Sequence, residues 1–110
     1  MESSQVLEAL SALAQATRLS VFRLLVQAGP CGFTAGEIAR RLGIPNATLS
    51  FHLKELAQAG LIRARQRGRF FYYAADFDAM QALIAFLTEN CCRGKPCFTQ
   101  EECANDQTHL

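Results

Sequence analysis

Apolar residues recur at helical spacing along most of this chain and alternate with polar residues in only one short segment. Leucine and valine positions three or four apart predict an amphipathic helix over residues 4–14. A second apolar face lies between residues 19 and 26, and Gly29-Pro30 is expected to end that helix. We expect Thr17 to cap its start.

The clearest local signal is the segment Thr34-Ala35-Gly36-Glu37, which has the Ser/Thr-x-x-Glu spacing of a capping box. The helix that it opens is expected to stop at Gly43. Asn46 is a favourable N-cap for the next helix, whose leucines form an inward face before Gly60 stops it. Two such helices joined by a short turn predict a helix-turn-helix, with the second helix in the DNA major groove.

A β-hairpin is predicted after this helix pair. Apolar and polar residues alternate within residues 61–66, Arg67-Gly68 is expected to turn, and residues 70–73 supply aromatic side chains for a return strand. Arginines at positions 63, 65 and 67 project from one face, with Arg69 just past the turn. A basic hairpin of this kind is expected to act as a wing that reaches DNA phosphates or a minor groove. An ordinary hairpin with a basic exposed face is the alternative.

The last predicted helix begins near Asp76 or Asp78 and carries more apolar residues than one face needs. Such a helix is typical of burial against both its own domain and a partner. Together with the first helix it is expected to form a homodimer interface. The predicted fold is mainly α with a small β-hairpin, a dimeric winged helix-turn-helix, with one domain over 1–92 and a cysteine-containing tail over 93–110.

Charge is distributed unevenly although the net charge is only +1. Residues 34–73 hold seven basic and two acidic side chains, whereas residues 74–110 hold two basic and six acidic ones. Basic charge concentrated in the middle of the chain suits a polyanion-binding surface. We expect no signal peptide, because Glu2 and polar residues precede any apolar run, and we expect no membrane span, because the apolar stretches are too short. We therefore expect a cytoplasmic protein with reduced thiols and no membrane partner.

Four of the five cysteines lie in the last twenty residues, as Cys91, Cys92, Cys97 and Cys103. Several thiolates together select soft, thiophilic ions. Neighbouring cysteines on a helix point about 100° apart, so Cys91 and Cys92 converge only where the helix ends. Gly94 and Pro96 supply that ending and allow Cys97 to fold back as a third ligand. A thiol cluster attached to a DNA-binding module suggests a sensor.

The order of these elements resembles the ArsR-type metalloregulators. The resemblance covers residues 5 to about 92 and is most specific in the recognition helix and its run into the wing, Ser50-Phe51-His52-Leu53-Lys54-Glu55-Leu56 and Ala59-Gly60-Leu61-Ile62. An opening helix leading into Leu13-Ala14-Gln15-Ala16-Thr17-Arg18-Leu19 fits as well. Many members carry a Cys-x-Cys pair before the recognition helix, but residues 36–41 contain no cysteine here. The Cys91-Cys92 pair with Cys97 instead resembles a subset of arsenite repressors whose thiolates lie at the end of the last helix.

The resemblance implies a non-enzymatic transcriptional repressor that releases double-stranded operator DNA when trivalent arsenic (arsenite) or antimonite binds. The expected ligands are Cys91, Cys92 and Cys97, with Cys103 as an optional fourth, and no organic cofactor is expected. The residues expected to contact DNA are Arg40, Arg41, Asn46, Thr48, Ser50, Phe51, His52, Lys54, Arg65, Arg67 and Arg69.

Several alternatives stay open from the sequence. The thiols could instead sense oxidants or reactive sulfur through a disulfide, hold a methylated arsenical on Cys91 and Cys92 alone, or bind zinc or another soft ion. A thiol-dependent enzyme is disfavoured because the chain has no Cys-x-x-Cys in a βαβ context and no base placed to activate a nucleophile. A zinc-stabilised interaction module is disfavoured by the basic middle segment. Cys31 is expected to be incidental.

Overall fold

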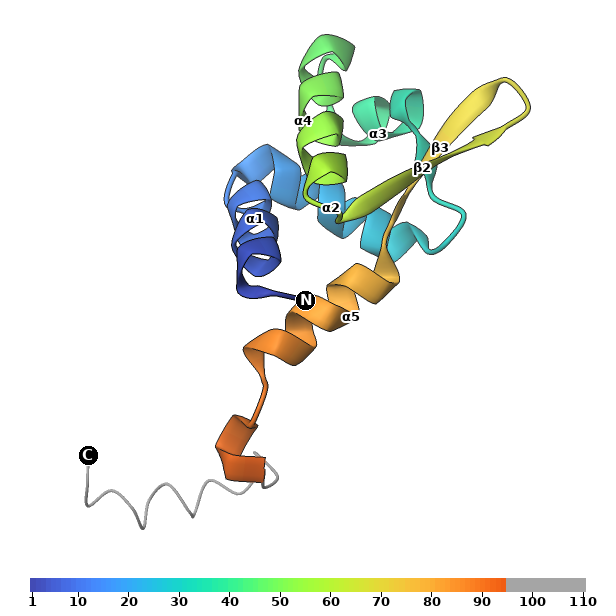
Figure 1. Ribbon diagram of the computed structural model, residues 1–110. Helices are drawn as coiled ribbons and strands as arrows, with labels where there is room; N and C mark the ends of the chain where they lie inside the picture. The colour runs from blue at the N-terminus through green and yellow to red at the C-terminus, as the bar shows by residue number, and fades with distance from the viewer. Residues whose placement is uncertain (95–110) are drawn as a thin grey trace.

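The computed structural model describes residues 1–94, which fold into five helices, three strands and a terminal 3-10 turn (Figure 1). In chain order these are α1 (Ser3–Leu13), α2 (Ala16–Ala28), β1 (Phe33–Thr34), α3 (Ala35–Leu42), α4 (Asn46–Gln58), β2 (Ile62–Arg67), β3 (Phe70–Ala75), α5 (Phe77–Leu87) and η1 (Cys91–Gly94). The predicted mainly α fold with a small hairpin is confirmed.

The core lies where α1, α2 and α4 pack together and cover one end of the hairpin. Its largest fully buried side chains include Leu25, Ile38, Leu56 and Leu61. Complete burial of such a side chain stabilises the fold by about 1.5–3 kcal/mol. The helix-turn-helix is therefore held by the same core that anchors the base of the wing.

The three strands form an antiparallel sheet in the order β1-β3-β2. Phe33 pairs with Tyr73, and the hairpin pairs Ile62 with Ala75 at its base and Arg67 with Phe70 at its tip. Strand β1 was absent from the sequence interpretation because two residues cannot display an alternating pattern. Gly32 precedes it with φ +69°, at a close approach to the Tyr73 carbonyl where a Cβ has no room.

Three local predictions require correction. Gln15, not Thr17, caps α2, because its side-chain oxygen accepts the Arg18 N–H at 2.8 Å. Pro45, not Asn46, is the N-cap of α4, so Asn46 is its first helical residue. The hairpin turn consists of Gly68 and Arg69, one residue later than predicted, with a positive φ at Gly68.

The predicted last helix is present, and Asp76 caps it by accepting the Ala79 N–H at 3.0 Å. Helix α5 extends away from the body formed by the other elements (Figure 1). Only Leu83 of this helix is buried, while Ile84, Phe86 and Leu87 are exposed. Within residues 1–94 no single helix is long and apolar enough to cross a membrane, and the α1–α2 pair reaches that length and composition only with a 103° bend.

Candidate nucleic-acid interface and thiol site

The capping box fixes the start of α3, the first helix of the helix-turn-helix. The Thr34 hydroxyl accepts the Glu37 N–H at 3.2 Å, and the Glu37 carboxylate accepts the Thr34 N–H at 2.9 Å. The bond to the Thr34 backbone is the main reason that the pKa of Glu37 lies below its usual value. The Thr34 hydroxyl and the positive charges of Arg40 and Arg41 lower this pKa further, and burial opposes them by raising it. Gly43 ends α3 in the left-handed conformation, as predicted.

Helix α4 presents one face to the core and the opposite face to solvent. Leu49, Leu53 and Leu56 are buried, as predicted, and the Pro45 carbonyl accepts the first helical hydrogen bond from the Leu49 N–H at 2.9 Å. The exposed residues of this helix include Asn46, Thr48, Ser50, Phe51 and Lys54. Phe51 is 55% exposed, an unusual position for a phenyl ring. The outward face therefore combines hydroxyl, amide, ammonium and aromatic groups, which suit contact with base edges and phosphates.

His52 does not belong to that face, which corrects the sequence interpretation. Its ring is only 7% exposed, lies edge-on to Phe51 with the ring centroids 5.5 Å apart, and has Nδ1 at 3.5 Å from an Arg18 guanidinium nitrogen. The Arg18 Nε also donates to the Ala12 carbonyl at 2.7 Å. His52 thus lies on the inward side of α4, near Arg18 and the junction of α1 and α2. Its spacing from Leu49 and Leu56 matches the inward stripe, which is the signal that sequence reasoning missed.

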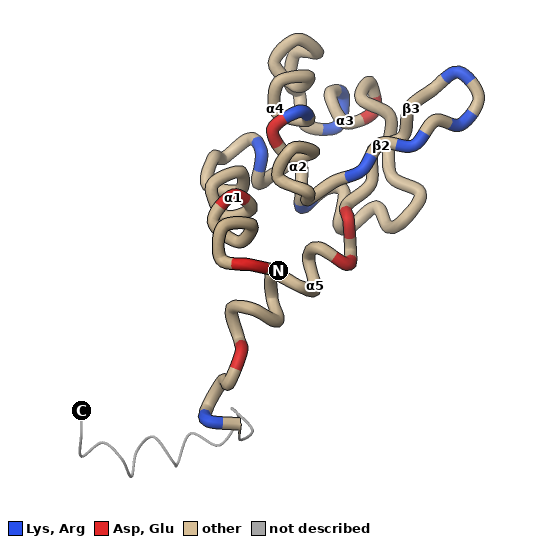
Figure 2. Tube along the Cα trace, viewed as in Figure 1, with Lys and Arg blue, Asp and Glu red and all other residues tan. Residues whose placement is uncertain are grey.

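Basic side chains lie on α3 and β2, two elements that contact α4. Arg40 and Arg41 at the end of α3 are exposed, and the Arg41 guanidinium lies 4.3 Å from the centroid of the Phe33 ring. Figure 2 shows lysine and arginine on α3, α4 and the wing, although α3 and α4 each also carry one acidic residue, Glu37 and Glu55. The start of α5 carries acidic residues alone, so basic charge predominates on the helix-turn-helix and wing.

The wing carries its arginines on one face. Arg63, Arg65 and Arg67 share that face with their cross-strand partners Ala74, Tyr72 and Phe70. The Arg67 guanidinium lies 4.0 Å from the centroid of the Tyr72 ring, a cation–π contact that restricts the arginine while leaving it exposed. Arg69 occupies the turn itself.

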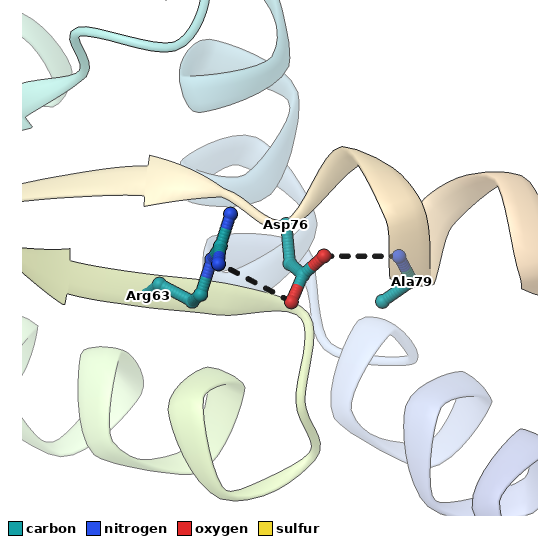
Figure 3. A network of polar contacts seen from close by, with 3 residues as sticks. All are labelled: Arg63, Asp76 and Ala79. Carbon is teal, nitrogen blue, oxygen red and sulfur yellow. Dashed lines mark hydrogen bonds and ion pairs between the residues drawn. The ribbon is translucent and has the colours of Figure 1, made fainter.

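Arg63 at the wing base is directed toward α5 instead. Its Nε lies 3.7 Å from Asp76 Oδ2, while Asp76 Oδ1 accepts the Ala79 N–H (Figure 3). The Arg63 side chain is 72% exposed, so this ion pair is worth at most about 1 kcal/mol. One carboxylate therefore both caps α5 and contacts the wing base.

A pocket of about 420 Å³ lies beside the arginine-bearing face, between the wing and the loop that follows α2. Its lining includes Cys31, Arg65 and Phe77. The sequence interpretation treated Cys31 as incidental, and the structure places it next to the wing. This proximity depends on tertiary packing and has no local sequence signal.

Cys91 and Cys92 lie just beyond α5, where the helix has ended. Asn90, Cys92 and Arg93 adopt positive φ values of 58°, 52° and 57°, so the backbone reverses instead of continuing the helix. Both thiols are exposed, and the Cys91 thiol donates to the Cys92 sulfur at 3.6 Å. The predicted convergence of the pair at a helix end is therefore present.

The remaining predicted ligands, Cys97 and Cys103, lie outside the described residues. Among residues 1–94 no group of three or more His, Cys, Asp or Glu side chains is placed to hold a metal ion. The described part of the site is a pair of neighbouring thiols.

Comparison with known proteins identifies the family. A helix-turn-helix domain model matches residues 13–65. An HTH-type transcriptional regulator of Methanocaldococcus jannaschii is 34% identical over 83 residues, which cover 74% of this chain and 90% of that protein.

Solved structures agree with the sequence match. A homodimeric winged helix-turn-helix DNA-binding domain from Mycobacterium bovis, described as a possible ArsR-family regulator, is 30% identical with a TM-score of 0.62, and the match covers 79% of this chain and 81% of that one. An ArsR-like regulator from Rhodococcus sp. RHA1 has the same fold, with 21% identity, a TM-score of 0.73 and coverage of 96% and 93%. The chain therefore belongs to the ArsR-type family of winged-helix, DNA-binding transcriptional regulators.

Proposed function

We propose that this regulator is a homodimeric, cytoplasmic repressor that releases its operator when Cys91, Cys92 and Cys97 bind trivalent arsenic or antimony. The observation that carries the proposal is the 3.6 Å separation of the Cys91 and Cys92 sulfurs at the end of α5. A vicinal thiol pair in this position is a chelating site attached to a helix with an exposed apolar face.

The spacing of the sulfurs fits a shared soft ion. Two thiolates bound to one tetrahedral zinc ion at about 2.3 Å are about 3.8 Å apart, close to the separation found here. Trivalent arsenic forms three bonds to thiolate sulfurs in a pyramid, and the third sulfur would come from Cys97. Lys95 and Pro96 separate Cys97 from the described residues, a span short enough for the chain to fold back.

The DNA-binding face follows from the exposed surface of α4 and its basic surroundings. Thr48, Ser50, Phe51 and Lys54 are exposed, and we assign the first three to bases or sugars and Lys54 to phosphates. Asn46 at the start of α4, the two α3 arginines and the wing arginines at positions 65, 67 and 69 complete the set. Each arginine that neutralises a phosphate adds salt-dependent affinity.

The proposed dimer interface uses the first and last helices. Leu7 and Leu10 of α1 and Ile84 and Leu87 of α5 are exposed large apolar side chains on elements that contact each other. The Mycobacterium bovis neighbour is described as homodimeric. A symmetric dimer would bury these side chains and set the two recognition helices about 34 Å apart, one turn of DNA.

The switch requires the DNA-free form to hold the ion more tightly than the DNA-bound form. When Cys97 is drawn toward Cys91 and Cys92, the chain after α5 closes on the end of a dimer helix and shifts the spacing of the two protomers. Typical couplings of about 1–3 kcal/mol weaken operator affinity by about 5- to 150-fold.

The test uses the reduced full chain bound to fluorescent DNA from its own promoter, titrated with arsenite while anisotropy is followed. We expect release, abolished by Cys91→Ser, Cys92→Ser or Cys97→Ser and retained in Cys103→Ser. Cys31→Ser is the matched control, since it removes a thiol beside the wing. Unchanged anisotropy with stoichiometric arsenite would refute the arsenic proposal.

Thiol oxidation or reactive sulfur is the second candidate, favoured by the exposure of the same thiols. It predicts DNA release with a mass loss of two hydrogens under mild oxidant and no response to arsenite. Mass spectrometry of the released protein separates the two candidates.

A further inference from the structure

Two phenylalanines at the tip of the wing are not buried in the core of the fold. Phe70 and Phe71 are 58% and 54% exposed, although burial of a phenyl ring is worth about 1.5–3 kcal/mol. They begin β3 directly after the Gly68-Arg69 turn, so they lie at the end of the wing farthest from the core. Their exposure calls for a partner surface.

The pairing register places the two rings on opposite faces of the hairpin. Phe70 is opposite Arg67, and Phe71 is opposite Gln66. The Gln66 side chain donates to the Gly68 carbonyl at 3.3 Å, which ties the strand to the turn. The tip is thus a short, braced ribbon with an aromatic ring on each side.

Cationic groups lie on the Phe70 face of the tip and in the turn. Arg67 is held by the Tyr72 ring on the Phe70 face, Arg65 lies one pair further along that face, and Arg69 is in the turn. A partner must therefore accept apolar contact at its centre and offer negative charge at its edges. A DNA minor groove has that chemistry, with sugars and base edges inside and phosphates along both rims.

The apolar surfaces of α1 and α5 differ from the tip in this respect. The charged residues of α1 and α5 are acidic, Glu8 and Asp78, whereas every charged residue of the β2–β3 hairpin is an arginine (Figure 2). The apolar surfaces of α1 and α5 therefore suit a second copy of the chain, and the wing tip suits a polyanion.

We propose that Phe70 and Phe71 act as an apolar wedge in the operator minor groove, opening the groove and bending the DNA away from the wing. A minor groove is about 6 Å wide, too narrow for a hairpin with two phenyl rings, so entry requires widening. Apolar side chains that enter this groove partly unstack base steps and bend the duplex toward the major groove. Operator preference would then extend to flexible steps beneath the wing, such as TA or CA, which the protein reads through their deformability.

This inference rests on the proposed operator binding and is tested without any inducer. Promoter DNA carrying a fluorophore at each end reports bending by energy transfer, and anisotropy reports affinity. For the Phe70→Ala/Phe71→Ala variant we expect loss of the bend and affinity lower by about 10-fold or more. The slope of log affinity against log salt should stay unchanged, because no phosphate contact is lost.

Three controls make the result decisive. Arg69→Ala should lower the salt slope by about one while retaining the bend. Phe51→Ala removes an equally exposed ring from the recognition helix and should weaken binding without abolishing the bend. The Phe70→Leu/Phe71→Leu variant keeps apolar volume at the tip and should bend DNA more than the alanine variant, which guards against misfolding of the wing.

Wild-type affinity and bending in the folded double alanine variant would overturn the wedge while leaving operator binding intact. If the wild-type protein binds no promoter fragment, the proposed operator binding itself fails. Binding of anionic phosphatidylserine vesicles that needs Phe70 and Phe71, with DNA bending unaffected by their loss, would assign the tip to a lipid surface and also overturn the wedge.

Discussion

Arg18 links three helices, and its removal should destabilise the domain without changing any DNA contact. Its Nε donates to the Ala12 carbonyl at 2.7 Å, near the end of α1, where helix carbonyls lack intrahelical partners. Its guanidinium also approaches the buried His52 ring at 3.5 Å, a distance at the weak limit of a hydrogen bond. The short bond to the carbonyl should therefore carry most of its contribution.

The expected loss of stability follows from the carbonyl group that the substitution leaves without a hydrogen-bond donor. Ala12 is buried, so Arg18→Ala deprives a shielded carbonyl of a charged donor, worth about 1.5–3 kcal/mol. Taking about 2 kcal/mol, and about 4–8 °C per kcal/mol for a domain of this size, the melting temperature should fall by about 8–16 °C. In a double-mutant cycle with His52→Ala, the coupling energy should stay below about 0.5 kcal/mol because that contact is long.

The assay is urea unfolding followed by circular dichroism, at one fixed protein concentration because dimerisation contributes to stability. Arg23→Ala is the matched control, since Arg23 is exposed on the same helix. The salt slope of DNA binding should be unchanged in both variants. A loss of stability below 0.5 kcal/mol in Arg18→Ala, or a lowered salt slope, would refute this reasoning.

Four further outcomes follow from local geometry. Thr34→Ala should cost about 1 kcal/mol, measured by urea unfolding, because it removes half of the capping box. The pKa of Glu37 is lowered on folding, so the stability that Glu37 contributes is fully present above its unfolded pKa and is lost as pH falls through its folded pKa. In the Glu37→Gln variant the free energy of unfolding should therefore depend less on pH in that acidic window. Gly32→Ala should destabilise more than Gly29→Ala in thermal melts, because both have positive φ but only Gly32 meets backbone. Lys54→Ala should lower the salt slope of DNA binding by about one, and an unchanged slope would remove Lys54 from the phosphate contacts.

Several features that depend on residues close together in the chain were predicted correctly from the sequence. The Thr34 capping box, the stop at Gly43 and the alternating wing are local patterns with a direct physical cause, and each is present in the structure. The cap of α2 was misassigned because Gln15 and Thr17 both carry side-chain oxygens near the helix start, and only the backbone geometry selects between them.

Other features depend on contacts between distant segments. The burial of His52 could have been found from its place on the leucine stripe, but its expected role in DNA contact outweighed that pattern. The short strand β1 exists because Phe33 pairs with Tyr73, forty residues later. The approach of Cys31 to the wing likewise arises from the packing of the loop after α2. Neither the β1–β3 pairing nor the approach of Cys31 to the wing leaves a periodic signal.

The position of the thiol pair restricts how it can act on DNA. Cys91 and Cys92 follow the far end of α5, on the opposite side of the molecule from α4 and the wing tip (Figure 1). Within one protomer a ligand bound there would lie on the other side from the recognition helix, so under the proposed function it acts through the arrangement of two protomers. Spin labels can be introduced with an unnatural amino acid at Ala57, an exposed position of each α4. Arsenite should change the distance between the two labels, while the rate of hydrogen exchange within α4 stays the same. Faster exchange in α4 at a constant label distance would instead indicate local unfolding of the recognition helix and would contradict a mechanism based on dimer geometry.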